Sequence, residues 1–119
     1  MGALRRFLDR LAESDETRLA EETRTWASGV ADAVPIAEAP MRERVTIAGV
    51  IRRLTVFPME GGEVLEALVA DGTGEVVVSF MGRRSIGGLG LGTRVVVEGV
   101  LGEQRGIVKM LNPHLELSM

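Results

Sequence analysis

Two patterns of apolar residues divide the chain into a helical N-terminal part and a β-rich remainder. In residues 3–13 the apolar side chains recur at the spacing of an amphipathic helix. They are Leu4, Phe7, Leu8 and Leu11. Residues 16–27 predict a second, weaker helix, because Ser14 and Asp15 interrupt the apolar stripe and are residue types that commonly begin a helix.

From residue 44 onward the apolar residues recur at every second position, which is the period of a β-strand. Thirteen of the fifteen glycines also fall in this part and separate the apolar runs. The pattern predicts five strands, over residues 44–57, 63–70, 75–81, 93–101 and 107–117. The first strand is the longest, and Gly49 at its centre predicts a bulge or a sharp bend.

Five strands with the longest and bent one first are typical of a closed Greek-key barrel of the OB (oligonucleotide/oligosaccharide-binding) type. The longer connection over residues 82–92 lies where this fold often carries a helix, but it is too rich in glycine for more than one helical turn. We therefore predict a mainly β fold, with a five-stranded barrel at 44–119, a short α-helical extension at 1–33 and a connector at 34–43.

Charge is unevenly distributed along the sequence. The net charge is −3. Residues 1–43 hold six arginines and nine acidic residues, whereas residues 44–119 hold eight basic and eight acidic residues. An acidic protein is not expected to bind nucleic acid tightly through net charge alone. Lys109 is the only lysine, and arginine binds phosphate in a bidentate manner that lysine cannot match, although a codon bias would produce the same composition.

Several classes of protein are not supported by the sequence. The chain has no cysteine, no apolar run of transmembrane length and no recognisable secretion signal, so we expect a cytoplasmic protein that does not associate with a membrane. The glycine-rich run 87–92 precedes a strand instead of a helix, which argues against a dinucleotide site. His114, the only histidine, has no nucleophile motif beside it. We therefore expect neither catalysis nor a cofactor or metal ion.

Short motifs in the C-terminal part resemble a known family. They are the Asp-Gly-Thr-Gly turn at Asp71–Gly74, the alternating strand Val76–Met81, Gly92 followed by Val95–Gly99, and Met110–His114. Over residues 44–117 the chain resembles the OB-type wedge domain of the RecG branched-DNA helicase. It is also similar to small stand-alone actinobacterial OB-fold nucleic-acid-binding proteins, which share a start like MGALRRFLDRL.

This resemblance implies an OB barrel and a nucleic-acid ligand, but no unwinding activity. The phosphate-binding loop that a helicase needs is missing from the sequence. The wedge family tends to end its third strand with paired aromatic residues, whereas this chain has Phe80 followed by Met81.

A nucleic-acid site on an OB barrel lies across strands two and three and the neighbouring hairpin loops. The basic candidates for binding phosphate are Arg52, Arg53, Arg83, Arg84, Arg105 and Lys109. Phe57 and Met81 are the candidates for contacting bases, because alternation places Phe80 in the core. We expect single-stranded or branched DNA, or RNA, to bind weakly and with little sequence preference. Alternatively, the arginines only balance nearby glutamates, and the barrel or its helix binds a protein partner.

The N-terminal helix leaves two alternatives open. Its apolar stripe of Leu4, Phe7, Leu8 and Leu11 covers the open end of the barrel, or it pairs with a second chain to form a homodimer. Helices this short are marginally stable in isolation, so the stripe requires one of these contacts.

Overall fold

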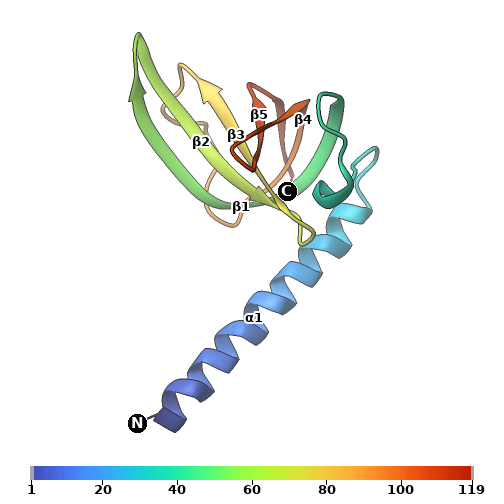
Figure 1. The fold of residues 1–119 in the computed structure, drawn as a ribbon, viewed down its shortest axis with the longest axis vertical. Helices are drawn as coiled ribbons and strands as arrows, with labels where there is room; N and C mark the ends of the chain where they lie inside the picture. The colour runs from blue at the N-terminus through green and yellow to red at the C-terminus, as the bar shows by residue number, and fades with distance from the viewer. Residues whose placement is uncertain (1, 119) are drawn as a thin grey trace.

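The computed structural model describes residues 2–118 and consists of a long helix joined to a small β-barrel (Figure 1). Its elements are α1 (Gly2–Ser28), the 3-10 helix η1 (Ile36–Glu38), β1 (Arg44–Met59), β2 (Gly62–Ala70), β3 (Glu75–Met81), β4 (Arg94–Gln104), β5 (Ile107–Leu111) and β6 (His114–Ser118). The predicted mainly β fold with an N-terminal helix is confirmed. Within these residues, no helix combines the length and the apolar character needed to cross a membrane.

Five of the strands form a closed ring. The neighbours around the ring are β1-β2-β3-β5-β4, and β4 pairs back with β1. The β3–β5 pair is parallel, and the other pairs in the ring are antiparallel. This order and these directions are those of an OB barrel, so the predicted fold class is confirmed.

Strand β1 serves both halves of the barrel by bending at its centre. Its first half pairs with β4 and its second half with β2. A Cβ atom at Gly49 would lie 2.6 Å from Cγ1 of Val69 and 2.7 Å from the carbonyl oxygen of Ala70, so only glycine fits there. The register with β2 shifts between Ile51 and Arg53, which leaves a bulge just beyond the glycine.

The last predicted strand, over 107–117, is two strands. It is interrupted at Asn112, whose φ is +47°, and at Pro113, which has no N–H group for a strand hydrogen bond. The first part, β5, pairs with β3 and β4, whereas the second part, β6, pairs with β4. The kinked chain packs closely on Gly99, where a Cβ atom would lie 2.9 Å from Cγ of Met110.

The barrel encloses a single apolar core among the described residues. Its buried members are Ile36, Ala39, Val45, Ile47, Ile51, Leu65, Ala67, Val69, Val76, Val78, Phe80, Val95, Val97, Leu101 and Met110. Ile36 and Ala39 come from the segment before β1. Ile86 and Leu89, in the connection between β3 and β4, pack against its edge, and this connection contains no helix in the part of the chain described.

Asp71 links the β2–β3 hairpin to η1. Its side chain is 2% exposed. One carboxylate oxygen accepts hydrogen bonds from the N–H groups of Thr73 and Gly74, at 2.8 and 3.1 Å, and from the Thr73 hydroxyl at 2.6 Å. The other oxygen accepts a hydrogen bond from the Ile36 N–H at 2.8 Å. The hairpin predicted as a turn therefore also holds the chain that precedes β1.

Helix α1 is continuous, so the predicted division into two helices at Ser14–Asp15 is wrong. Neither residue is a strong helix breaker, and their side chains point into solvent, where each costs only a fraction of a kcal/mol. The Asp15 carboxylate also lies 3.9 Å from the Arg18 guanidinium within the helix.

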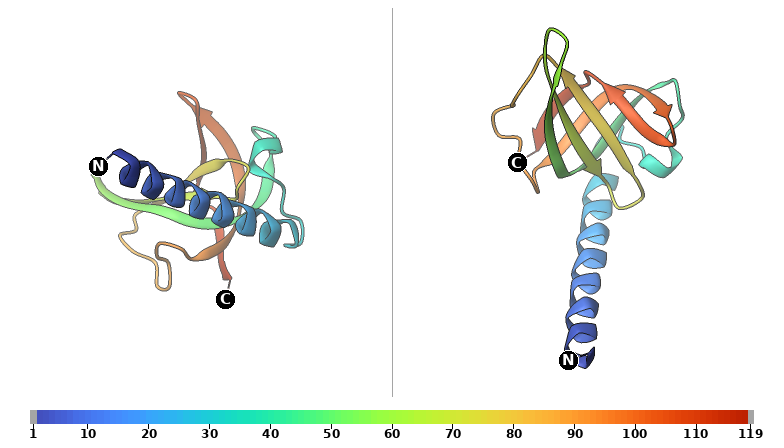
Figure 2. Two further views of the ribbon diagram at one scale, coloured as in Figure 1. Left: turned by 90° about the horizontal axis from the view of Figure 1, so that it is seen from below. Right: turned by 60° about the vertical axis from the view of Figure 1, so that its left-hand side comes forward.

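Only the C-terminal part of α1 contacts the barrel (Figure 2). Thr23 is buried, and Ala20 and Trp26 are half-buried against the β2–β3 hairpin and the start of β4. A Cβ atom at Gly72 would collide with the carbonyl oxygen of Ala20, so this glycine is required for the close approach. The Arg94 guanidinium stacks over the Trp26 ring, 5.0 Å from its centroid.

The N-terminal part of α1 projects away from the barrel. The apolar side chains of its stripe are largely exposed: Leu4 63%, Phe7 55%, Leu8 54% and Leu11 48%. The expectation that they cover the open end of the barrel is wrong. Docking through Ala20 and Thr23 directs the helix axis outward, so the stripe cannot reach the barrel (Figure 1).

Candidate nucleic-acid interface

The strand register brings two basic residues to opposite edges of one sheet face. Residues that lie directly opposite each other on neighbouring strands project from the same face. Arg53 on β1 is opposite Leu68 on β2, Leu68 is opposite Val77 on β3, and Val77 is opposite Lys109 on β5. These four residues form one row across the outside of the barrel.

Two further rows follow it along the strands. One consists of Thr55, Glu66, Ser79 and Leu111, and the other of Phe57, Val64 and Met81. We call these three rows the outer face. It covers β1, β2, β3 and β5, and neighbouring strands lie about 4.8 Å apart, so Arg53 and Lys109 are separated by about 14 Å across the sheet.

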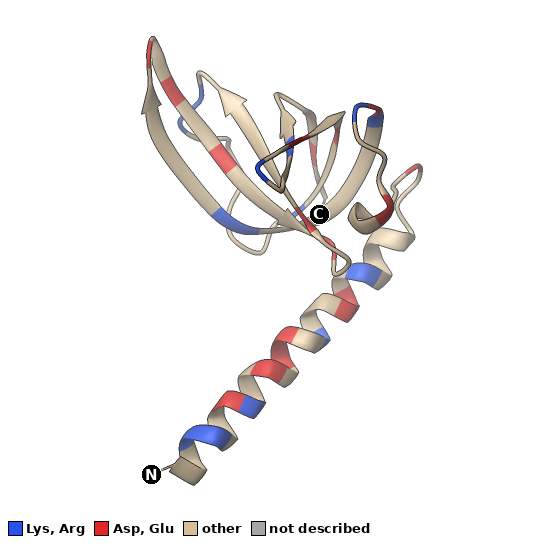
Figure 3. Ribbon diagram, viewed as in Figure 1, with Lys and Arg blue, Asp and Glu red and all other residues tan. Residues whose placement is uncertain are grey.

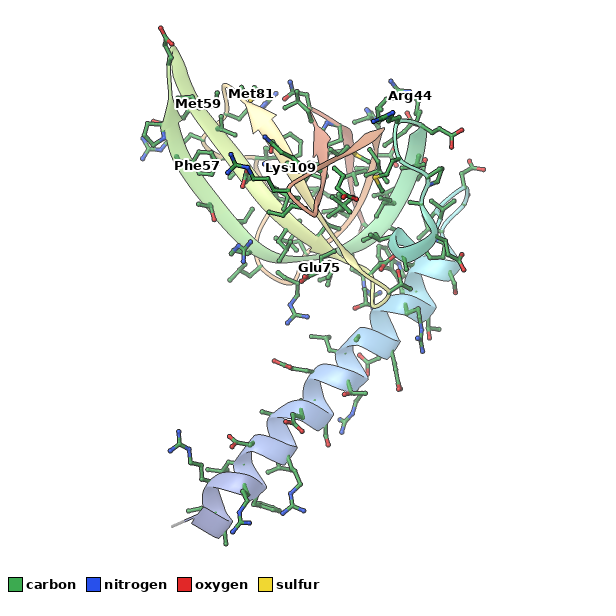
Figure 4. All side chains as sticks on the ribbon, viewed as in Figure 1. Arg44, Phe57, Met59, Glu75, Met81 and Lys109 are labelled. Atoms are coloured by element: carbon green, nitrogen blue, oxygen red, sulfur yellow. The ribbon has the colours of Figure 1, made fainter. Side chains whose placement is uncertain are left out.

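The third row is the most apolar part of the outer face. Val64 is buried between its two neighbours, Phe57 is half-buried, and Met81 is 42% exposed. Figure 4 shows Phe57, Met59 and Met81 at the same end of the barrel. The predicted base-contacting residues Phe57 and Met81 are therefore close together. The alternation argument that placed Phe80 in the core is confirmed, since Phe80 is 7% exposed.

Arg52 does not belong to the outer face, although Arg53 beside it does. It lies in the β1 bulge and lines a hollow of about 290 Å³ at the base of α1, together with Thr23, Gly72 and Glu75. The structure therefore places two adjacent predicted arginines in different environments.

The two arginines that follow β3 also differ. The Arg84 guanidinium lies 3.7 Å from a carboxylate oxygen of Glu63, at the start of β2. Arg83 instead lines an open hollow of about 380 Å³ between the end of β3 and the β5–β6 connection. Arg84 therefore balances a nearby glutamate, as the alternative interpretation of the arginines predicted.

The hollow beside Arg83 contains polar residues that the sequence did not indicate as a site. Asn112 lines it, and its Oδ1 accepts a hydrogen bond from the Met81 N–H at 2.8 Å. His114 is on the same wall, with Nε2 3.5 Å from a Glu116 carboxylate oxygen. The Asn-Pro-His sequence was the available signal, because an Asn-Pro pair predicts a turn that redirects the following side chains.

Arg105 lies at the tip of the β4–β5 hairpin, where its φ is +55° and that of Gly106 is +80°. Positive φ at both residues is typical of a type I′ turn, which keeps the Arg105 side chain in solvent. Arg105 is therefore near the β5 edge of the outer face, two residues before that strand begins.

The outer face also carries negative charge. Glu66 lies in its middle row, and the Ser79 hydroxyl donates a long hydrogen bond of 3.4 Å to its carboxylate. Among residues 2–118, no three His, Asp or Glu side chains gather closely enough to hold a metal ion. The outer face therefore combines apolar side chains, a few separated cations and the carboxylate of Glu66.

Comparison with known proteins bears on the fold alone. No protein family matches the sequence, and no curated protein is significantly similar to it. The predicted similarity to the RecG wedge and to actinobacterial proteins therefore stays a prediction. The chain is similar in structure to a chain of a Replication Protein A heterotrimer bound to ssDNA, with a TM-score of 0.53 and 16% sequence identity. The match covers 78% of this chain and 70% of that one, and it supports the assignment of the barrel to the OB fold.

Proposed function

We propose that this chain is a non-catalytic protein that binds single-stranded nucleic acid, or the single-stranded part of a branched DNA, across the outer face. The observation that carries the proposal is the row Phe57–Val64–Met81, an apolar strip at one end of the outer face. The row at the other end of this face, beyond the middle row, ends in the cations Arg53 and Lys109. Apolar side chains on the same face as separated cations suit a polymer of flat bases joined by phosphates.

The proposed division of roles follows from position. Phe57 and Met81 contact bases, while Arg53 and Lys109 contact phosphates on either side of the β2–β3 pair. Arg83 and Arg105 extend the site beyond the two ends of the strands. Arg84, held by Glu63, and Arg52, at the base of the helix, contribute less to the affinity.

The similarity to an OB barrel in a protein bound to ssDNA supports this choice of ligand class. Low sequence specificity is expected because an apolar surface contacts every base in the same way. The face has few aromatic residues and carries Glu66, so we expect weak binding that decreases strongly as the salt concentration increases.

The test is fluorescence anisotropy with labelled single-stranded DNA, forked DNA, duplex DNA and single-stranded RNA at several salt concentrations. The double variant Arg53→Gln and Lys109→Gln removes two phosphate contacts. The slope of log affinity against log salt should therefore decrease by about 1.4 for single strands, since each contact contributes about 0.7.

The matched control is Arg44→Gln, a basic residue on β1 that lies at the other end of the strand from Phe57 and pairs with Glu98 at 3.7 Å (Figure 4). It should leave the slope unchanged. An equal loss in the control and the double variant would mean that binding is a general effect of charge, and would contradict the outer face as the site.

A second candidate function is protein binding by the same face. The specific observation in its favour is the combination of Glu66 with exposed Met59 and Leu111, which are 47% and 63% exposed. Absence of binding to every nucleic acid at low salt, where electrostatic attraction is strongest, would favour this second candidate.

A further inference from the structure

The first two thirds of α1 are not covered by the rest of the described chain. All residues from Gly2 to Leu19 are exposed, and Ala20 is the first that the barrel covers. A helix of this length is marginally stable in water, and four large apolar side chains on one stripe make the exposed state less favourable. We call residues 2–19 the bare segment. Its apolar side chains are not buried by any part of the described chain.

Charge is segregated along the helix (Figure 3). Residues 2–12 contain three arginines and one aspartate, a net charge of +2. Residues 13–22 contain five acidic residues and one arginine, a net charge of −4. Positive charge near the N-terminus is the opposite of what the helix dipole favours, so this arrangement does not stabilise an isolated helix.

We propose that the bare segment pairs in antiparallel orientation with the same segment of a second copy of this chain. Antiparallel pairing places the basic end of each helix beside the acidic middle of the other, and it also opposes the two helix dipoles. Arg5 and Glu16 are eleven residues apart, close to three turns, and so lie on the same side of the helix. In a two-fold pair centred near Leu11, Arg5 of each helix faces Glu16 of the other, so this ion pair forms twice.

The length of the bare segment fits the same pairing. When residue 5 is opposite residue 16, residue 2 is opposite residue 19, and the overlap ends just before Ala20 meets the barrel. Leu11 then lies beside its equivalent at the two-fold axis, whereas Leu4, Phe7 and Leu8 lie opposite Thr17, Ser14 and Glu13 of the other copy. The two barrels lie at opposite ends of the pair. A parallel pair would bring both barrels to the same end and would place like charges side by side.

A lipid surface is a less suitable occupant. Anionic membranes attract amphipathic helices with basic polar faces, which residues 2–12 have. The acidic residues 13–22 follow on the same straight helix and would be repelled by an anionic surface. Charge complementarity therefore favours a second copy, and this inference does not depend on the proposed nucleic-acid function.

The first test is the mass of the full chain in solution by sedimentation equilibrium over a range of concentrations. We expect the mass to rise from 12.8 kDa toward twice that value. Two charge-reversed proteins then test the orientation: Arg5→Glu with Arg6→Glu, and Asp15→Arg with Glu16→Arg. Each protein alone should stay a monomer, because all facing charges are now alike, whereas an equimolar mixture should form a heterodimer.

Circular dichroism is the control for these variants. Arg and Glu both favour helices, so the helix content of the equimolar mixture should match that of the wild type. The antiparallel geometry has an independent check, since the natural sequence has no cysteine. Ala12→Cys lies near the two-fold axis and should form a disulfide between copies on mild oxidation. Ala3→Cys lies far from its equivalent and should not.

Three results would overturn the proposal. The first is a wild-type protein that stays monomeric at the highest soluble concentration. The second is a mixture of the charge-reversed proteins that remains monomeric. The third is stronger cross-linking at Ala3→Cys than at Ala12→Cys, which would mean a parallel pair. Co-sedimentation of the monomer with anionic vesicles, lost when Leu8 and Leu11 are changed to Gln, would assign the segment to a lipid surface instead.

Discussion

At the scale of single residues, the outer face owes its character to the alternation of side chains along its strands. Phe80 and Met81 are neighbours in sequence, yet one is in the core and the other is exposed on the outer face, in the same row as Phe57. Consecutive residues of a strand point to opposite faces, so the sequence pattern is sufficient to predict which of the two is exposed.

The aromatic ring of Phe57 offers a direct test of the base-contacting role. Phe57→Ala should weaken binding of single-stranded DNA at least about 5-fold, because stacking of one base contributes about 1–3 kcal/mol. Val56→Ala is the matched control, since Val56 is the adjacent residue, is 43% exposed and points to the other face of β1. Anisotropy titrations of both variants that gave equal losses would argue against stacking on Phe57.

Asp71 is a residue whose importance the sequence did not reveal. Its turn was predicted from local chemistry, but its contact with Ile36 joins positions 35 residues apart. Such a contact depends on how the chain folds back, and no local pattern of residues contains that information.

Replacing Asp71 by Asn should destabilise the protein by about 2–3 kcal/mol, because a charge-assisted hydrogen bond is lost and the amide NH₂ group faces the Ile36 N–H. The measurement is urea unfolding followed by circular dichroism. Asp32→Asn is the control, because Asp32 is exposed and Asn tolerates its φ of +66°. A stable Asp71→Asn variant would mean that the buried carboxylate is not needed to hold η1.

At the scale of elements, the sequence predicted the strands better than the breaks between them. The barrel was predicted from the period of two and from the bend at Gly49. This pattern is clear because one face of each strand is buried, so every second residue along it is apolar. The continuous α1 and the break at Asn112–Pro113 were missed. Whether Ser14 ends a helix, or Pro113 divides a strand, depends on small local energies that neighbouring elements can override.

The close approach of α1 to the β2–β3 hairpin predicts the effect of Gly72→Ala. The new methyl group would collide with the helix backbone at Ala20, so the helix should detach and Trp26 should become more exposed. The chain has a single tryptophan, so a red shift of its fluorescence reports this directly.

Gly61→Ala is the control for backbone strain. Gly61 has nearly the same φ, +86° against +88°, but has open space around it. It should show only the cost of a positive φ for alanine, about 1 kcal/mol in urea unfolding, without the fluorescence shift. Identical behaviour of the two variants would show that the helix does not depend on the Gly72 contact.

At the scale of the whole molecule, the barrel carries the folding free energy and the bare helix segment does not. Among residues 2–118, the buried members of the apolar core include none that precedes Ile36. Removing residues 2–19 should therefore leave the urea midpoint of the barrel unchanged, within about 0.5 kcal/mol, when measured at a concentration where the full chain is monomeric. A clearly lower midpoint would mean that this segment packs on the barrel after all.

The closed strand order also has a consequence for the protein during translation. Because β5 is inserted between β3 and β4, the nascent chain cannot complete the ring before residues 107–111 have left the ribosome. Until then β3 has an unpaired edge, whereas α1, whose hydrogen bonds are local, can already form. A cell that produces this protein therefore has to protect an open sheet from aggregation between the emergence of β3 and that of β5.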